Sequence, residues 1–442
     1  MKKTICSMLS ITIIFLFSTT YIYSNQSIDL KGETAVLIDG TTGEILYDKK
    51  MHQEMYPAST TKIMTAILVL ENCDLDETVI IDDETPFTEG SRIYLLEDER
   101  VTIEQLLHAL LIESANDAAV ALAKHISGSV ENFCNRMNQR AEELGALNTH
   151  FNNPNGLPDE EHYTTAYDLA MIAKHALKKD KFREIITIVN YHMPATNKQD
   201  DRYFRITNRM LWDSKKIFDY NGEYVAPMYE YATGVKTGYT IASGYCLVAS
   251  AEKNNREVIS VVLKSDPNSV YLDSRKLLDH GLNDYKNIEI QKQGDLAGIV
   301  RVQGGATKFV DAVVTEDIVK TVSKDFDEAN IKKEVMLPED LTAPVDKGDR
   351  LGSINVTING EEVDTIALFA SAGIEKSFAA SMAVKAGGAF KSLKIVLLFV
   401  ILAILGNIGQ IVIVNVRRIK RRRHRRQKYK IDSNYINRNI LK

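Results

Sequence analysis

The chain has 442 residues, of which 45% are hydrophobic and 26% are charged, a composition typical of globular proteins with room for two domains and further segments. Its four cysteines are too few and too widely spaced for a small disulfide-stapled fold, and its nine histidines show no metal-ligand spacing. We therefore expect no metal and no cofactor. The formal net charge of −5 conceals an asymmetry, because residues 416–442 carry +11 and leave −16 on the rest of the chain.

The first 24 residues have the pattern of a secretory signal peptide. Lys2 and Lys3 precede a mostly apolar stretch at 8–17, and Ser24 is a small residue that suits cleavage. An uncleaved membrane anchor is the alternative interpretation. Either way, this end of the chain predicts export of the segment that follows.

The next segment, 25–285, has strand patterns at both ends and helical patterns between them. The expected strands are 34–38, 45–47, 245–251 and 257–263. Helical periodicity dominates 59–177, and a closing helix is expected at 273–282. These patterns predict one α+β domain whose sheet is built from the two ends of the segment and is flanked by helices.

From residue 286 the pattern becomes β-rich. Ile354, Val356 and Ile358 alternate with polar residues, and the pair Asn359-Gly360 then turns the chain. We expect a small β-rich domain at 286–375 that carries no chemistry. An Ala-, Gly- and Ser-rich linker is expected at 376–392.

The apolar stretch 393–416 predicts a transmembrane helix, because it is long enough to cross a bilayer core of about 30 Å. The basic tail 417–442 follows at once, and positive residues stay on the cytoplasmic side of a membrane. We therefore expect a single-pass protein of the cell membrane with an extracytoplasmic body and a cytoplasmic tail. Because the basic run adjoins a membrane span, nucleic-acid binding is not expected.

Three motifs in the body supply complementary parts of an acyl-transfer site: Ser-x-x-Lys at 59–62, Ser-x-Asn at 114–116 and Lys-Thr-Gly at 236–238. Each motif alone is weak, because a chain of this length contains such patterns by chance. Ser250 and Lys253 form another Ser-x-x-Lys, but they lie in a strand pattern, where residues three apart face opposite sides. The prediction of an acyl-transfer site rests on the presence of all three motifs in this order.

The first motif predicts a nucleophile and its base. Apolar residues at helical spacing follow it, so the Lys62 amine can reach the Ser59 hydroxyl. Lys62 can accept a proton only when it is neutral, and burial or the nearby cation of Lys236 would lower its pKa. The backbone N–H of Ser59 can face a developing oxyanion. The alternative is that Ser59 caps a core helix and Lys62 is a solvated charge.

The other two motifs predict a proton relay and a substrate anchor. The Ser114 hydroxyl can pass a proton to the leaving amine, and the Asn116 amide can hold a peptide group or else cap a helix. Lys236 beside the Thr237 hydroxyl suits a terminal carboxylate, and Gly238 lets a substrate backbone lie close. The alternative is an exposed turn with a solvated lysine.

These motifs and their flanks resemble the low-molecular-mass penicillin-binding proteins, the serine-type D-alanyl-D-alanine carboxypeptidases of peptidase family S11. The resemblance covers about 34–370. Its matching segments are 57–66, 113–119, 153–157, 164–170, 236–240 and 276–281. It implies a β-lactamase/transpeptidase-like domain followed by a small β-rich domain. It also implies removal of the terminal D-alanine from peptidoglycan stem peptides that end in D-Ala-D-Ala, through an acyl-enzyme, with β-lactam antibiotics as inhibitors.

The resemblance also assigns roles to residues of this chain. The implied catalytic residues are Ser59, Lys62 and Ser114, the substrate-binding residues are Asn116, Lys236, Thr237 and Gly238, and the oxyanion hole is formed by the backbone N–H groups of Ser59 and Tyr239. Two positions depart from the family pattern, because Ile241 stands where an Asp is common and Val270 where an Arg is common. They leave the carboxylate to Lys236 and Thr237.

Three alternatives stay open at this point. A D,D-endopeptidase would use the same residues to cut cross-links. A β-lactamase is disfavoured, because Glu143 stands one position too far from Leu147-Asn148 for the water-activating Glu-x-x-Leu-Asn pattern. A catalytically idle, penicillin-binding wall scaffold would require a geometric defect in an otherwise complete site.

Overall fold

The structure, a computed structural model, describes residues 28–439, without the side chains of 379–381, 383–393 and 424–439. The predicted signal peptide lies outside these residues. The chain divides into two compact units, one reaching Gln291 and including Asp317–Ala329, the other made of Lys292–Glu316 and the residues from Asn330 on. The ribbon of β12 (Tyr285–Gln291) and β15 (Ile318–Ser323) therefore groups with the first unit. The expected domain boundary at 286 stays a prediction.

A five-stranded antiparallel sheet forms the centre of the first unit, in the order β2-β1-β11-β10-β9. Its strands are β1 (Thr34–Asp39), β2 (Ile45–Lys49), β9 (Ala232–Thr240), β10 (Gly244–Lys253) and β11 (Arg256–Ser265). The register sets Thr34 opposite Leu263 and Gly238 opposite Cys246. The predicted sheet, made from the two ends of the segment, is confirmed, and β9 is one of its edges.

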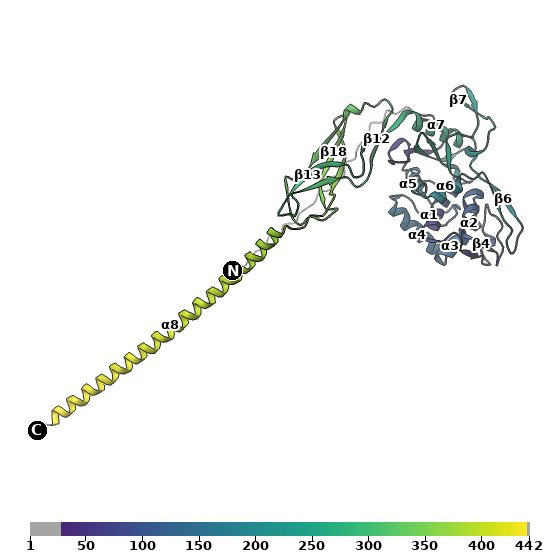
Figure 1. The fold of residues 1–442 in the computed structure, drawn as a ribbon. Helices are drawn as coiled ribbons and strands as arrows, with labels where there is room; N and C mark the ends of the chain where they lie inside the picture. The colour runs from purple at the N-terminus through teal and green to yellow at the C-terminus, as the bar shows by residue number, and fades with distance from the viewer. Residues whose placement is uncertain (1–27, 440–442) are drawn as a thin grey trace. The chain divides into compact units, whose positions relative to one another are not determined.

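Successive side chains of β1 point to opposite faces of the sheet and belong to two different hydrophobic clusters. Val36 and Ile38 belong to a large cluster on the helical side, whereas Ala35 and Leu37 pack in a smaller cluster on the opposite face. The smaller cluster is covered by α7 (Ser269–Asp284), which Figure 1 shows on the side away from α1–α4. Both faces of the sheet are therefore buried.

The remaining helices of the first unit lie between β2 and β9 in the sequence. They are η1 (Ala58–Thr61), α1 (Lys62–Asn72), η2 (Thr85–Phe87), α2 (Ile103–His108), the π-helix η3 (Ala109–Glu113), α3 (Asn116–Ser127), α4 (Val130–Glu143), α5 (Ala166–Ala176), α6 (Asp180–Ile186) and η4 (Arg209–Leu211). Three two-stranded antiparallel sheets lie among them: β3 (Thr78–Ile80) with β4 (Arg100–Thr102), β5 (Asn190–Met193) with β6 (Arg202–Arg205), and β7 (Phe218–Tyr220) with β8 (Glu223–Val225). The 3-10 turn η5 (Glu328–Asn330) follows β15.

The second unit contains a six-stranded sheet in the order β16-β18-β19-β14-β13-β17. Its strands are β13 (Leu296–Gln303), β14 (Phe309–Val313), β16 (Ile331–Met336), β17 (Asp340–Thr342), β18 (Arg350–Ile358) and β19 (Glu361–Ala370). The predicted turn at Asn359-Gly360 joins β18 to β19, and both of its residues have positive φ. The β-rich character expected here is confirmed.

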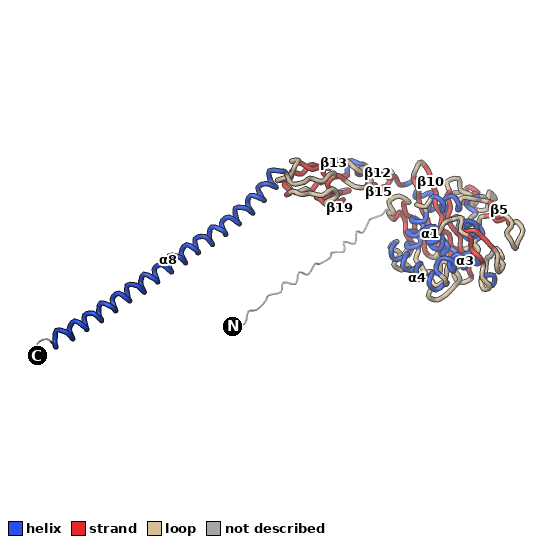
Figure 2. Tube along the Cα trace, turned by 60° about the horizontal axis from the view of Figure 1, so that its bottom comes forward, coloured by secondary structure: helices blue, strands red, loops and turns tan. Residues whose placement is uncertain are grey.

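A single helix of 62 residues, α8 (Phe378–Asn439), follows the second sheet and is continuous in Figures 1 and 2. The segment expected as a linker is therefore helical from Phe378 onward. Within residues 28–439, one helical stretch, Lys394–Arg423, is long and apolar enough to cross a membrane. It contains residues 394–416 of the predicted span, 393–416, together with the first residues of the basic tail.

Candidate active site

The 3-10 turn η1 carries Ser59 immediately before α1, so the hydroxyl lies at the entrance of a helix and is half-buried. Ala58, the preceding residue, has a φ of 49°, a left-handed conformation that side chains disfavour. Gly156 packs against this turn so closely that a Cβ on it would come within 1.9 Å of the Ala58 carbonyl oxygen. A glycine is therefore required at 156 to hold the nucleophile turn in place.

Lys62 is fully buried, and its Nζ contacts three oxygens. Nζ lies 2.9 Å from Ser59 Oγ, 2.6 Å from Asn116 Oδ1 and 2.7 Å from the Asn155 carbonyl oxygen. The amide and carbonyl oxygens can only accept hydrogen bonds, whereas the hydroxyl can also donate one. A neutral amine, with two N–H groups and one lone pair, satisfies both acceptors and points its lone pair at the serine hydroxyl.

The surroundings of Lys62 favour this neutral form. Burial, and next the ammonium of Lys236, hold the pKa of Lys62 well below its usual range, and Asp117 opposes them. The alternative of a helix-capping Ser59 with a solvated Lys62 is therefore wrong: the lysine is 0% exposed and Ser59 makes no side-chain cap. The lysine has the position and the pKa direction of a general base.

The second motif lies where two helices meet. The π-helix η3 ends at Ser114, which has a φ of 65° and donates its backbone N–H to the Ala109 carbonyl. Asn116 begins α3 and makes no side-chain cap there. Its Oδ1 accepts from Lys62, while its Nδ2 donates to the Glu89 carbonyl at 2.7 Å. The capping alternative for Asn116 is thus wrong, and its amide orients Lys62.

The third motif lies within β9, at the edge of the sheet. Lys236 is 1% exposed, which excludes the solvated turn considered as an alternative. Burial lowers the pKa of Lys236 to about 7, and the nearby Glu113 partly opposes this. Lys236 Nζ donates to the Thr237 carbonyl at 3.1 Å, and Thr237 Oγ1 donates to Thr207 Oγ1 at 2.6 Å. Lys236 is thus a buried amine beside the Thr237 and Thr207 hydroxyls.

Gly238 brings β9 against the nucleophile turn. A Cβ on Gly238 would lie 3.0 Å from the backbone N of Ser59, from Ala58 Cβ and from the Pro57 carbonyl oxygen. The next residue, Tyr239, is about half exposed on this edge strand. The backbone of β9 therefore lies close against the backbone of Ser59.

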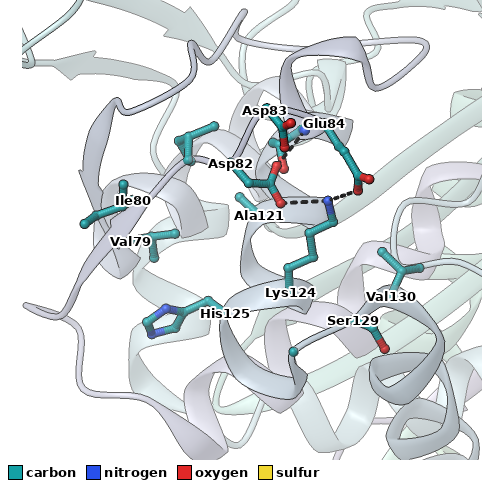
Figure 3. A pocket seen from close by; sticks show the side chains of 13 residues that line it. Val79, Ile80, Asp82, Asp83, Glu84, Ala121, Lys124, His125, Ser129 and Val130 are labelled. Carbon is teal, nitrogen blue, oxygen red and sulfur yellow. Dashed lines mark hydrogen bonds and ion pairs between the residues drawn. The ribbon is translucent and has the colours of Figure 1, made fainter.

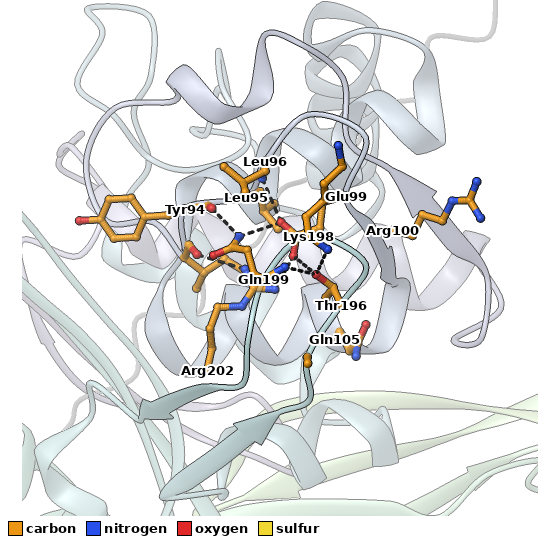
Figure 4. Close-up of polar contacts among 12 residues, drawn as sticks. Tyr94, Leu95, Leu96, Glu99, Arg100, Gln105, Thr196, Lys198, Gln199 and Arg202 are labelled. Atoms are coloured by element: carbon orange, nitrogen blue, oxygen red, sulfur yellow. Dashed lines mark hydrogen bonds and ion pairs between the residues drawn. The ribbon is translucent and has the colours of Figure 1, made fainter.

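The loop 89–99 lies beside Asn116, and the buried carboxylates of Asp117 and Glu99 bind to it or lie within it. Asp117 accepts hydrogen bonds from the backbone N–H groups of Ile93 and Leu95. Further along, Glu99 is 0% exposed and accepts from Arg202 at 2.6 Å, within the polar cluster of Figure 4. These contacts fix the loop whose Glu89 carbonyl orients Asn116.

A cavity elsewhere in the first unit lies away from the motifs. It has a volume of about 640 Å³ and opens at the far end of α3, where Lys124 bridges Asp82 and Glu84 (Figure 3). Lys124 is eight residues beyond Asn116, about 12 Å along the helix axis. This cavity therefore does not belong to the catalytic constellation.

The two departures from the family pattern lie in different environments. Ile241 is 95% exposed in the turn after β9, whereas Val270 is 2% exposed and packs in the smaller core cluster. Beside the following residue, Tyr271, lies Arg209, whose guanidinium is 5.1 Å from the centre of the Tyr271 ring and pairs with Asp213. A buried valine cannot replace an arginine as an anion ligand.

Sequence reasoning did not single out several residues that complete the site. Asn155 acts through its backbone carbonyl, Thr207 through a hydroxyl beside Thr237, and Glu113 through its charge near Lys236. The segment containing Asn155 was part of the family resemblance, but a backbone carbonyl leaves no trace in residue type. Glu113 also lay in a segment of the resemblance, at 113–119, but no role was assigned to it, and Thr207 lay outside the matching segments.

Comparison with known proteins decides the family. The profile of D-alanyl-D-alanine carboxypeptidases, peptidase family S11, matches residues 21–267. This chain belongs to that family. A second profile, the C-terminal domain of penicillin-binding protein 5, matches residues 285–376. These two matches confirm the family resemblance inferred from the motifs. The S11 carboxypeptidases are serine hydrolases that form an acyl-enzyme.

Relatives and solved structures agree with this membership. The chain is 35% identical to D-alanyl-D-alanine carboxypeptidase DacF of Bacillus subtilis, over 75% of this chain and 82% of the relative. It is 30% identical to DacD of Escherichia coli, over 77% and 86% of the two chains. Penicillin-binding protein 5 of Haemophilus influenzae has a similar structure, with a TM-score of 0.67 and 28% identity over 79% of this chain and 99% of that one. The predicted transpeptidase-like fold is confirmed.

Proposed function

We propose that this chain removes the terminal D-alanine from peptidoglycan stem peptides, with Ser59 as the nucleophile. The observation that carries the proposal is the 2.9 Å contact between Ser59 Oγ and the fully buried Nζ of Lys62. A lysine with a lowered pKa can accept the hydroxyl proton at neutral pH. Membership of the carboxypeptidase family supports the same reaction.

We propose the following acylation step, which the contact between Lys62 Nζ and Ser59 Oγ supports. Lys62 takes the proton of Ser59 while Oγ attacks the carbonyl carbon of the penultimate D-alanine. The backbone N–H groups of Ser59 and Tyr239 stabilise the negative charge that develops on the carbonyl oxygen. When the peptide C–N bond breaks, the leaving amine receives a proton from the protonated Lys62 through the Ser114 hydroxyl. Water then attacks the ester with the same lysine as base and releases the shortened peptide.

The specificity for a chain end rests on Lys236 and Thr237. A terminal carboxylate beside Lys236 would give this buried ammonium an anionic partner, and the Thr237 hydroxyl would donate to the carboxylate in place of Thr207 Oγ1. Gly238 leaves room for the substrate backbone along β9. Asn116 has both ends of its amide engaged within the protein, which supports a role in holding Lys62. Direct binding of a substrate peptide group by Asn116 remains a prediction.

Intact mass after exposure to penicillin tests the nucleophile. We expect one covalent adduct on the native protein and none on Ser59→Ala, because β-lactams imitate the D-Ala-D-Ala end. Ser250→Ala, which alters the other Ser-x-x-Lys motif, should keep the adduct. D-alanine release from a pentapeptide should be lost with the adduct. An adduct on the Ser59→Ala protein contradicts the assignment.

We further propose an arrangement of the whole chain across the cell membrane. The proposed segments are a signal peptide at 1–24, the catalytic domain at 25–285, the β-rich domain at 286–375, a linker at 376–392, a membrane span at 393–416 and a cytoplasmic tail at 417–442. The charge asymmetry and the candidate span support this orientation. Protease added to intact cells should remove the body and leave a C-terminal tag protected; digestion of the tag contradicts the orientation.

A further inference from the structure

The proposed membrane span of α8 carries two amide side chains far from either end of its apolar stretch. Asn407 lies thirteen residues after Lys394 and ten before Arg417, so about 20 Å and 15 Å of helix separate it from these charged residues. Gln410 lies about one turn further along, some 10 Å before Arg417. In a bilayer both amides lie within the hydrocarbon, which offers no hydrogen-bond partner.

The chain itself satisfies only part of this hydrogen-bonding capacity. Asn407 Nδ2 donates to the Ala403 carbonyl at 3.0 Å, one helical turn earlier, and this uses one of its two N–H groups. The Asn407 Oδ1 and the amide of Gln410 have no hydrogen-bond partner within residues 28–439. The apolar window of this stretch is 0% buried within the same residues. These groups therefore favour a partner that lies beside α8 in the membrane.

The two amides belong to one seam of the helix. Residues that are alternately four and three positions apart lie on the same side, which is the spacing by which two helices pack in a left-handed coiled coil. The residues of the seam are Val396, Val400, Ala403, Asn407, Gln410 and Val414. Every Leu, Ile and Phe of the stretch 395–416 lies off the seam. The seam thus combines small and β-branched side chains, which allow close approach of a second helix, with the two amides.

A second copy of the same helix has the complementary surface. Copies that insert with the basic tail on the cytoplasmic side run parallel, so their equivalent residues lie at equal depth. An amide both donates and accepts, so Asn407 of one copy can bond Asn407 of the other, and the same holds for Gln410. An asparagine in an otherwise apolar seam also fixes the register of such a pair. A helix without polar groups at these depths would leave the amides unpaired.

We propose that α8 pairs with α8 of a second copy through this seam, with Asn407 and Gln410 hydrogen-bonded across the pair. The proposal rests on the proposed membrane span and goes beyond the proposed carboxypeptidase function, because it makes the membrane-bound enzyme a parallel dimer. Neither residue belongs to the acyl-transfer site, so pairing and acylation can be measured separately.

The test measures energy transfer between full-length copies that carry donor or acceptor dyes on a C-terminal tag, in phosphatidylcholine vesicles at increasing lipid-to-protein ratios. The native protein should keep its energy transfer on dilution with lipid. In Asn407→Leu/Gln410→Leu the association constant should fall roughly tenfold or more, because the interhelical hydrogen bonds are lost. Leucine favours both the helix and the membrane, so this variant should stay in the vesicles.

The matched control is Asn415→Leu, which removes an amide that lies off the seam and two residues before Arg417, where headgroups and water can satisfy it. It should pair like the native protein. Pairing that survives in Asn407→Leu/Gln410→Leu overturns the proposal, and so does an equal loss in Asn415→Leu. Energy transfer no higher than chance encounters produce in the native protein would leave the seam to a different membrane protein and also overturns it.

Oxidative cross-linking of full-length protein in cell membranes tests which side of the helix is involved. Ala403→Cys places a thiol in the seam, whereas Leu405→Cys places one about 200° away around the helix. A copper catalyst should produce a covalent dimer of the first variant in excess over the second, and equal yields contradict the seam. Both variants keep the native cysteines, so the difference between them reports the introduced thiol.

The same samples separate this proposal from the two on which the rest of the chain depends. Release of the native protein from the vesicles by high salt would refute the span and the pairing together. Penicillin labelling of Ser59 should be equal in the native protein and in Asn407→Leu/Gln410→Leu. Absence of labelling alongside retained energy transfer would contradict the proposed function and leave the pairing supported.

Discussion

The two buried lysines set opposite pH limits on the reaction. Lys236 must be charged to hold a carboxylate, and its pKa is about 7 without substrate. Its charged fraction falls as the pH rises, so kcat/KM for a peptide should decline above about pH 7. A bound carboxylate raises the pKa of Lys236, so kcat should persist to higher pH than kcat/KM. Initial rates of D-alanine release across the neutral and alkaline range check this.

The variant Lys236→Arg provides the control, because a guanidinium stays charged throughout this range. Its kcat/KM should be lower in absolute terms, but the alkaline decline should disappear. A decline that persists unchanged in Lys236→Arg would assign the alkaline limb to another group. Lys62 limits the acid side instead, because it must be neutral to act, and its pKa is lowered chiefly by burial.

The sequence predicts that Asn116 binds a peptide group of the substrate, whereas in the structure its amide contacts Lys62 and the Glu89 carbonyl. A substitution at Asn116 tests which of these two roles matters. Asn116→Asp keeps the shape but places a carboxyl group against Lys62 Nζ, which raises the pKa of the lysine. Acylation by penicillin should slow roughly tenfold or more at neutral pH and recover as the pH is raised. An equal slowing at every pH, together with a higher KM for peptide, would favour direct substrate binding.

The sequence predicted which side chains lie in the candidate site, but it did not predict all of their contacts. Ser59, Lys62 and Lys236 were singled out because hydroxyls and amines at these spacings suit an acyl-transfer reaction. The carbonyl of Asn155 and the inward-facing amide of Asn116 were not predictable, because they depend on where separate loops close in space. A sequence motif indicates which reactive side chains are present. The backbone groups that they contact are known only once the tertiary structure is known.

At the scale of elements, catalysis depends on how closely β9 approaches η1. Gly238→Ala would place a Cβ 3.0 Å from the backbone N of Ser59, so the strand or the turn must move. Misplacing an oxyanion-hole donor should slow acylation by about 10²–10³. The rate of penicillin acylation measures this. Gly373→Ala is the matched control, because its Cβ meets only ordinary contacts at 3.6 Å, and it should acylate normally.

The sequence patterns predicted the strands of the central sheet correctly, but they did not predict the irregular helical turns next to the motifs. The strands of the central sheet were predictable from runs of apolar and β-branched residues, and the two-ended sheet follows from their positions. The helix expected to start at Ser59 begins three residues later, after a 3-10 turn. The π-helix before Ser114 was also not predictable, because one residue added to a helical turn leaves the apolar periodicity nearly unchanged.

At the scale of the whole molecule, we expect α8 to hold the chain in the membrane without taking part in the acylation reaction. The full chain should stay with the membrane after washing with high salt, because the stretch 394–416 buries apolar side chains that surface charge cannot hold. A chain ending at Ser377, just before α8, should be released as soluble protein that still forms one penicillin adduct. Fractionation followed by labelled penicillin measures both properties in one experiment.

A chain ending at Val416 is the informative control, since it keeps the span and loses the basic tail. It should remain in the membrane fraction, although with less strict orientation, because positive residues beyond a span fix its direction. Loss of this chain from the membrane fraction without any salt wash would show that the tail holds the full-length protein to the membrane surface through charge. That result would exclude a spanning helix, while the acyl-transfer site some distance away in the sequence would remain unaffected.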